Sequence, residues 1–331
     1  MAAAVSTGPI VPPGTVRLVI WGADGIHETT DLTDLASAIG GGRWVWIDAT
    51  APSSAQVNEI GQVLGLHPLI AEDILEGNQR PKIEVTASLV HVVMFAIRYA
   101  EELDASEVDF VLGDHFLLSV HEPGWNPRGI HQMRGGLQSI MARGPDHLLW
   151  ALVDSIVDGY FPCMDRIGDQ IDDLQDEVIE RASRPALQRL FKLKRDLIAM
   201  RRVISPVREI FNQLTNRELA LIDNDEIIYF RDVYDHLIRI TDEVDTHREL
   251  VSGTLEVYLT TVNNNLSLIM KRLTGVTVIL AGVGAVAGIF GMSEAALAVR
   301  GGEGGGFWVV TGLTVLAAAA AAVFLRRIGW I

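Results

Sequence analysis

Histidine and cysteine are the side chains best suited to holding a transition metal, and this chain has nine histidines and one cysteine. His115 and His121 are the two that lie close together, six residues apart on what reads as one strand, so they could share a face. A zinc site there is one interpretation. The simpler interpretation is that all nine histidines are ordinary surface or core residues. Cys163 alone cannot form a disulfide within one chain, which fits a reducing compartment.

Other chemistry-bearing patterns are missing from the sequence. It has no glycine-rich phosphate loop, nucleophile elbow or HExxH sequence, so we predict no enzyme and no covalently bound cofactor. The formal net charge of −15 argues against a nucleic-acid partner, because binding phosphates needs a basic surface. Acidity suits a protein that gathers cations by long-range attraction, although it could equally serve only to keep the chain soluble.

Two long uncharged runs end the chain, at residues 273–293 and 304–325. Each would form roughly 30 Å of helix, which is the thickness of a bilayer core. A buried helix of a soluble protein is the alternative for either run. Two such runs in tandem favour two transmembrane helices, with an outer loop at 294–303.

Charges flanking these runs predict the orientation. They are Lys271 and Arg272 before the first run, Glu294, Arg300 and Glu303 between the runs, and Arg326 and Arg327 after the second. Lys and Arg next to membrane spans are enriched on the cytoplasmic side. Both chain ends, including the basic tail 326–331, are therefore expected in the cytoplasm, with the spans in the plasma (inner) membrane. One hairpin of two helices cannot enclose a water-filled path, so a conducting form needs several copies around an axis.

Residues 15–144 have the pattern of an α/β domain. β-branched and aromatic residues, broken by Gly, Asp and Pro, predict strands at 15–22, 42–49, 88–100 and 108–122. Between these strands, 53–66 and 67–77 read as short helices, the first capped by Ser53 or Ser54. Residues 1–14 lack a signal-peptide pattern, and we expect a disordered tail there.

The pattern becomes helical from residue 145. A hairpin is predicted at 145–222, from one helix kinked near Pro162 and a second that starts at Pro185 and bends near Pro206. A stalk helix at 223–272 then runs straight into the first membrane span. Together they would form one helix of roughly 65 residues, or about 100 Å.

The chain resembles the CorA family of pentameric magnesium and cobalt channels, which includes a zinc-transporting branch. The resemblance lies in QRPKIEV at 79–85, VDFVLGDHFLLSVHE at 108–122, IVDGYFPCMDRIGDQID at 156–172, LKRDLIAMRRVISPVREI at 193–210, YFRDVYDHLIRITDEVD at 229–245, VYLTTVNNNLSLIMKRLT at 257–274 and AGIFGM at 287–292. It implies a homopentamer in the lipid bilayer with a funnel-shaped cytoplasmic domain, in which each first span lines the axial pore.

The outer mouth departs from the family pattern. Where the family has Gly-Met-Asn, this chain has Gly291, Met292 and Ser293. In the family the Asn ring holds a hydrated cation, whereas Ser offers a shorter hydroxyl that both donates and accepts. Ser293 could alternatively only cap the helix. Glu294 and Glu303 would attract cations to the mouth or only mark the water boundary.

A pore face follows from the same resemblance, at helical steps of mostly three or four residues. It consists of Glu256, Thr260, Asn263, Ser267, Met270, Leu273, Thr274, Thr277, Ala281, Gly284 and Gly288. Met270 and Leu273 match apolar constrictions of the family. Such a constriction can close a pore by excluding water, and Ala281, which replaces a bulkier residue of the family, should widen the one at its level. Close helix packing is the alternative role for the small residues.

Asp232 matches an acidic residue with which the family binds magnesium between cytoplasmic domains to close the pore. The corresponding region of the α/β domain reads Thr86-Ala87-Ser88, where acids are common in the family. An exposed Asp that is only solvated is the alternative.

We therefore predict transport of divalent cations, chiefly magnesium with cobalt or nickel as competitors. Zinc transport, with or without coupling to protons, is a second hypothesis. A diverged, non-conducting membrane scaffold or cation sensor is a third, because the family's Asn is replaced by Ser293.

Overall fold

The computed structural model describes residues 12–100, 102–217, 219–291 and 305–330. The chain forms two compact units, which are treated separately below. The first consists of Met1–Gln175 with Gln188–Gly253, and the second of Asp176–Leu187 with Thr254–Ile331. Eleven of the fourteen residues of the predicted tail, 1–11, lie outside the described residues, so its disorder stays a prediction.

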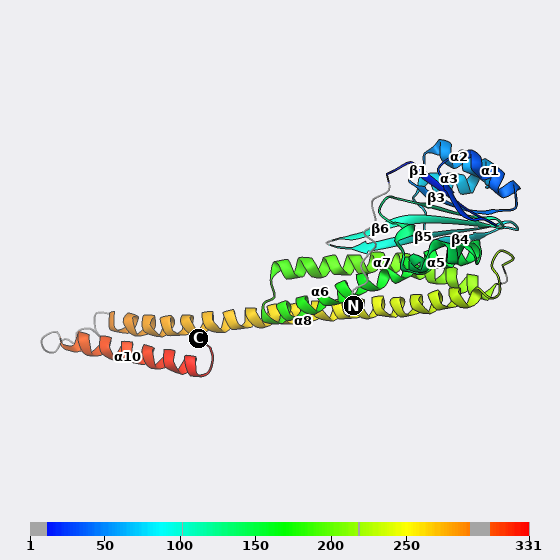
Figure 1. Ribbon diagram of the computed structural model, residues 1–331. Coiled ribbons are helices and arrows are strands. Elements are labelled where there is room, and N and C mark those ends of the chain that lie inside the picture. Colours follow the sequence, from blue (N-terminus) through cyan, green and yellow to red (C-terminus); the bar gives the residue numbers. More distant parts are fainter. Residues whose placement is uncertain (1–11, 101, 218, 292–304, 331) are drawn as a thin grey trace. The chain divides into compact units, whose positions relative to one another are not determined.

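A seven-stranded mixed sheet organises the first unit, in the order β2-β1-β3-β7-β6-β5-β4 (Figure 1). The strands are β1 (Thr15–Gly22), β2 (Gly25–Thr29), β3 (Trp44–Thr50), β4 (Lys82–Val85), β5 (Leu89–Tyr99), β6 (Leu103–Gly113) and β7 (Phe116–His121). β3 and β7 are parallel, and the other neighbouring pairs in the described sheet are antiparallel. β2, β4 and the helix α1 fall in segments where the sequence pattern predicted no element.

Three short helices cover one face of the sheet: α1 (Thr33–Gly40), α2 (Ser54–Leu64) and α3 (Pro68–Glu76). Their buried side chains, among them Leu35, Ile60 and Ile70, pack against β1, β3 and β7 in one apolar core. Ser53 caps α2, as predicted, and forms a full capping box with Gln56.

The segment 108–122 is a hairpin, not the single strand predicted. β6 ends at Gly113 and β7 begins at Phe116, with Asp114 and His115 in the turn. A side chain at position 113 would collide with the Phe116 ring, so the tight turn requires glycine. As a result, His115 lies in an exposed turn and His121 at the buried end of β7.

Helices also cover the other face of the sheet. They follow the short elements η1 (Pro127–Gly129), η2 (His131–Gly135) and α4 (Leu137–Met141). α5 (Pro145–Asp158) packs on the central strands, and the Tyr160 hydroxyl at the start of α6 (Tyr160–Glu180) donates to the Phe95 carbonyl at 2.6 Å.

The predicted single kinked helix is thus two helices, broken at Gly159. Pro162 lacks an N–H and crowds the carbonyl four residues earlier, which places the break at Asp158–Gly159 rather than at the proline itself. α7 (Arg184–Asn216) starts next to Pro185, as predicted, and continues through Pro206.

α8 (Ile227–Gly291) is one helix of 65 residues, the length expected from the sequence. Within the first unit it buries one stripe at steps of three or four, formed by Phe230, Val233, Leu237, Ile240 and Val244.

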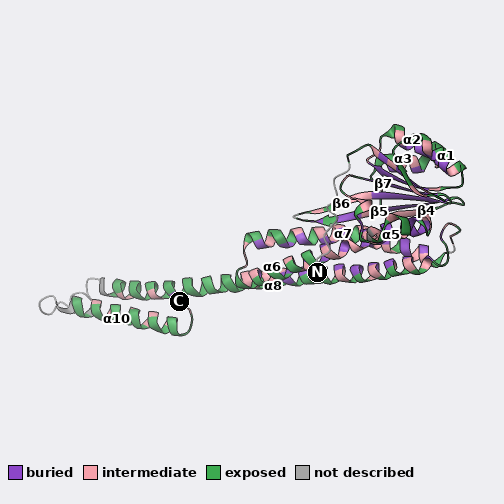
Figure 2. Cartoon of the chain, in the orientation of Figure 1, coloured by how far each residue is buried: buried purple, intermediate pink, exposed green. Residues whose placement is uncertain are grey.

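The second unit contains the tip between α6 and α7, the rest of α8, and α10 (Gly305–Arg327). Ser183 caps α7 there by accepting from the Ala186 N–H at 3.1 Å. Figure 2 shows the C-terminal part of α8 and most of α10 as exposed. Their exposed side chains include Leu266, Ile269 and Leu316, which are apolar.

Candidate cation sites

A stripe of small and oxygen-bearing residues runs along the C-terminal part of α8. We call it the α8 stripe: Glu256, Thr260, Asn263, Ser267, Met270, Thr274, Thr277, Ala281, Gly284 and Gly288. Because α8 is one uninterrupted helix, the stripe drifts around it by about 40° from Glu256 to Gly288, and its members lie within a sector of about 120°. Continuity of the helix therefore places the predicted face on one side.

Every member of the α8 stripe is exposed, and so is the neighbouring Leu273. Thr260 and Thr277 donate their hydroxyls to the carbonyls four residues earlier, at 2.9 and 2.8 Å, which leaves oxygen lone pairs free to accept from water. Most of α8 beyond residue 255 is exposed as well, so exposure does not by itself select the lining face. The role of the α8 stripe as a pore lining stays a prediction.

The predicted outer mouth lies mostly outside the described residues. α8 ends at Gly291, and Met292, Ser293, Glu294 and the loop to Glu303 follow it. α10 begins at Gly305, close to the start of the second predicted span.

Asp232, which sequence analysis singled out, belongs to a group of acidic and imidazole side chains in the first unit. We call it the Asp154 cluster: His131 of η2, Asp154 and Asp158 of α5, and Asp232 and His236 of α8. His236 lies 3.7 Å from Asp158 and 4.0 Å from Asp232, and His131 lies 3.7 Å from Asp158. Two overlapping triplets of this cluster offer ligand atoms within 4.8 Å of one another.

Asp154 is the buried member, at 7% exposed. Its Oδ2 accepts from the Gln132 amide at 2.7 Å, while its Oδ1 is buried without a hydrogen-bond partner in the described part of the chain. Burial, followed by the charge of Asp158, raises the pKa of Asp154 to about 6. Burial also raises the pKa of Asp158, against the opposing effect of the two histidines. A nearby positive charge would therefore stabilise the ionised form of both carboxylates.

The Asp154 cluster combines carboxylate and imidazole ligands, a set that suits divalent cations. The sequence pointed to Asp232 and not to the four others, and cation binding by Asp232 stays a prediction. A usable signal was present, because Asp154 and Asp158, like Asp232 and His236, are spaced i,i+4 on one helix face. What the sequence could not show is that η2, α5 and α8 meet here.

The histidine pair weighed for a zinc site, His115 and His121, has separate surroundings. His121 is buried against Asp48, with Nε2 3.1 Å from Oδ1, and its Nδ1 lies 2.7 Å from the Glu122 carbonyl. His115 lies 3.4 Å from Asp114 in the exposed turn. Each thus has its own acidic neighbour.

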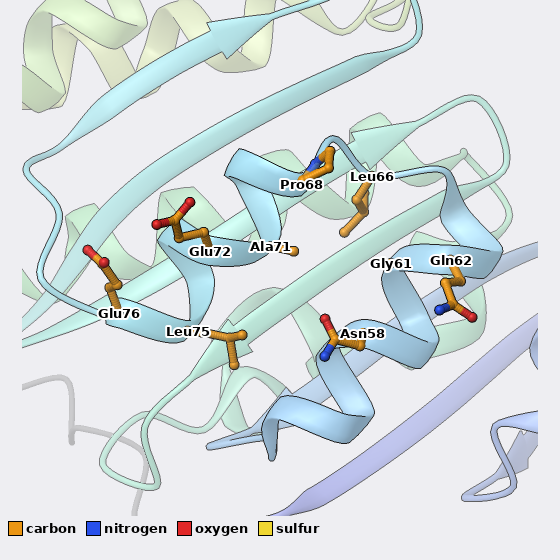
Figure 3. A pocket seen from close by; sticks show the side chains of 9 residues that line it. All are labelled: Asn58, Gly61, Gln62, Leu66, Pro68, Ala71, Glu72, Leu75 and Glu76. Carbon is orange, nitrogen blue, oxygen red and sulfur yellow. The ribbon is translucent and has the colours of Figure 1, made fainter.

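A groove of about 450 Å³ lies between α2 and α3. Figure 3 shows Glu72 and Glu76 at one end of it and Asn58 and Gln62 at the other, with Leu66 and Leu75 among them. Since the polar groups do not converge, we assign no cation to this groove.

Of the helices in the described residues, the stretch Ile227–Ile289 of α8 is long and apolar enough to cross a membrane. Only 6% of its most apolar window is buried, so its side chains are not the core of this chain. The family model described as "CorA-like Mg2+ transporter protein" matches residues 41–327. The chain belongs to the CorA-like Mg²⁺ transporter family. It is thus a member of a family of transporters, not of enzymes.

Individual relatives agree with this family. The cobalt/magnesium transport protein CorA of Thermotoga maritima is 36% identical over 275 residues, covering 80% of this chain and 78% of that protein. The zinc transport protein ZntB of Yersinia pseudotuberculosis is 23% identical over 61% of this chain and 62% of its own length. The solved CorA magnesium transporter of Methanocaldococcus jannaschii covers 100% of both chains with a TM-score of 0.77 at 19% identity, which shows a shared fold.

Proposed function

We propose that this protein carries divalent cations, chiefly magnesium, across the plasma membrane through a pore at the axis of a homopentamer. The α8 stripe lines that pore, with Leu273 beside it, and Gly291, Met292, Ser293 and Glu294 form its outer mouth. Both termini lie in the cytoplasm, and α10 forms the second span. Cobalt and nickel compete as substrates of similar charge and size.

One observation carries the proposal: the same helix bears the α8 stripe and an apolar window that is almost wholly unburied. An apolar helix surface of this extent needs lipid or other protein around it. A stripe of hydroxyl, amide and small side chains can pass a hydrated ion without stripping its waters, which magnesium gives up reluctantly. An inside-negative potential supplies about 2.3 kcal/mol per charge per 100 mV, so no ATP is needed.

The test is divalent flux into liposomes that contain the purified full-length chain. We expect magnesium uptake that follows the gradient and is inhibited by cobalt or nickel. Absence of any divalent flux, whatever the gradient, would rule the proposal out. Ser293→Asn separates a channel from a scaffold: flux that occurs only in this variant would mean that the native chain does not conduct.

We propose in addition that the Asp154 cluster binds the transported cation on the cytoplasmic side and reduces flux. Asp154 supplies a buried oxygen that has no hydrogen-bond partner among the described residues, and Asp232 and Asp158 add charge. Raising magnesium inside the liposomes should then inhibit the native chain and inhibit Asp154→Asn or Asp232→Asn less. Asp235→Asn, at an exposed acidic position on the same helix, is the matched control. Equal inhibition of all four proteins would exclude this regulation.

Zinc is the second candidate cargo, favoured by the imidazoles of His131 and His236 beside these carboxylates. Similarity to the zinc transport protein ZntB gives it further support. If zinc is the cargo, excess zinc blocks magnesium flux at much lower concentration than cobalt does, and uptake changes when a pH gradient is applied.

A further inference from the structure

A second polar group lies in the first unit, on the sheet face covered by α1–α3. Glu84 of β4 and His91 of β5 are direct cross-strand partners, so their side chains lie together on one face. Asp73 reaches the same place from α3, and Lys82 from β4. One ligand atom each from Asp73, Glu84 and His91 lies within 4.8 Å of the others.

His91 is fully buried, at 0% exposed. Its Nε2 lies 2.8 Å from Oδ1 of Asp109, which is also buried. An ionised carboxylate accepts only, so this contact holds the ring hydrogen on Nε2 and leaves Nδ1 as a lone pair. Nδ1 is buried and has no hydrogen-bond partner among the described residues. A histidine held by a carboxylate at one nitrogen and open at the other is the usual arrangement of a metal ligand.

Positive charge already lies between the two carboxylates. The Lys82 ammonium is 2.5 Å from Asp73 and 2.8 Å from Glu84. Burial lowers the pKa of Lys82, but its hydrogen bonds to both carboxylates outweigh this, and the net shift is upward. The Lys82 side chain is 25% exposed on a flexible stem, so it can leave toward solvent when another cation takes its place.

Negative charge in this group exceeds what Lys82 neutralises. The group contains the carboxylates of Asp73, Glu84 and Asp109 but one ammonium, and Glu107 on β6 lies near enough to interact with Asp73, His91 and Asp109. Oε1 of Glu107 is buried without a hydrogen-bond partner in the part of the chain that the structure describes. A divalent cation would restore the balance of charge.

We propose that Asp73, Glu84 and His91 form a binding site for a transition-metal ion, preferably Zn²⁺, within each subunit, with Asp109 orienting His91. An imidazole nitrogen beside two carboxylates selects Zn²⁺ or Co²⁺ over Mg²⁺, which prefers oxygen ligands and water. The site ties α3 to β4 and β5. It shares no residue with the α8 stripe or the Asp154 cluster, so it stands independently of the transport proposal.

The test is Zn²⁺ titration of the purified full-length chain against a chromophoric chelator. We expect His91→Phe to lose one equivalent of Zn²⁺ per chain and Asp109→Asn to weaken that equivalent by about 10–100-fold. Lys82→Met should strengthen it by at least about tenfold, because the competing ammonium is gone. His115→Gln, at an exposed histidine, should change nothing.

Co²⁺ supplies an independent readout, since its visible absorption reports the ligands directly. The band should be present in the native chain and in Lys82→Met, and be reduced in His91→Phe. Unchanged zinc stoichiometry and affinity in His91→Phe would overturn the proposal. If that variant fails to fold, as judged by circular dichroism, the proposal falls when neither Asp109→Asn nor Lys82→Met shifts the affinity.

Discussion

The two parts of α8 differ in what surrounds them, although they form one helix. Residues 227–253 bury an apolar stripe against the rest of the first unit, with Val233 and Leu237 at 0% exposed. Residues 254–291 leave apolar residues such as Leu266, Ile269 and Leu273 more than half exposed. The first part is stabilised by its own chain, while the second requires lipid or further copies.

Polar groups show the same contrast. In the first unit, carboxylates and histidines approach one another within a single chain, as in the Asp154 cluster around the buried Asp154. Polar members of the α8 stripe such as Asn263 and Ser267 are exposed, and in the proposed pentamer they would face the same residues of other copies. One chain therefore reveals possible binding sites in the first unit, but only a face in the second.

The largest expected effect is on solubility. A chain that ends after Gly253 should purify without detergent, because it keeps the buried stripe of α8 and loses the exposed apolar surface. Gel filtration with and without detergent is the measurement. Aggregation of the shortened chain in both conditions would contradict the difference drawn between the buried and exposed parts of α8.

Core substitutions should separate the two parts of α8 by stability. Leu237→Ala creates a cavity and should cost about 2–5 kcal/mol of unfolding free energy. Leu266→Ala, at a residue 54% exposed on the same helix, should cost less than about 0.5 kcal/mol. Chemical unfolding of the detergent-solubilised full chain gives both values. Equal costs would mean that the exposed part packs as firmly as the buried part.

Bulk added to the α8 stripe should reduce flux. Ala281→Leu places five isobutyl groups around the proposed axis and should lower magnesium uptake roughly tenfold by narrowing and dewetting the path. Val283→Leu adds bulk on nearly the opposite side of the helix and is the control. If the control lowers flux as much as Ala281→Leu, the α8 stripe is not the lining.

The smallest expected effect is on the pH dependence of stability. Burial, followed by the charge of Asp109, raises the pKa of Glu107 from 4.5 to about 7. The protonated form is therefore favoured in the folded state, and its contribution to stability, full below pH 4.5, is lost as the pH rises through about 7.

Glu107→Gln should remove this dependence. In EDTA, the melting temperature of the native chain should fall between pH 5 and 8 by a few degrees more than that of the variant. Thermal unfolding at the two pH values measures the difference. An equal fall of the melting temperature in both proteins would refute the raised pKa of Glu107.

Much of the fold could be predicted from local pattern. The long α8, the cap at Ser53 and the main strands follow from periodicity and capping chemistry. The hairpin at Gly113 was missed because a two-residue turn between apolar runs resembles one strand. The break at Gly159 was displaced because proline acts on the carbonyl four residues earlier.

Prediction of the sites was limited by long-range contacts. Asp232 was singled out through resemblance, but Asp154 approaches it, and His131 approaches Asp154, only because η2, α5 and α8 meet in the fold. The pairing of His91 with Glu84 depends on strand register, and β4 was not predicted. Met292, Ser293 and Glu294 still rest on sequence alone.

Accessibility of introduced cysteines tests the central claim most directly. Cys163 is the single native cysteine and is buried, so a water-soluble thiol reagent should leave native flux unchanged. If the α8 stripe lines the pore, the reagent should stop flux in Thr277→Cys, Ala281→Cys and Gly284→Cys but not in Ile279→Cys or Val283→Cys. Block at 279 and 283 with none at 277, 281 and 284 would contradict it.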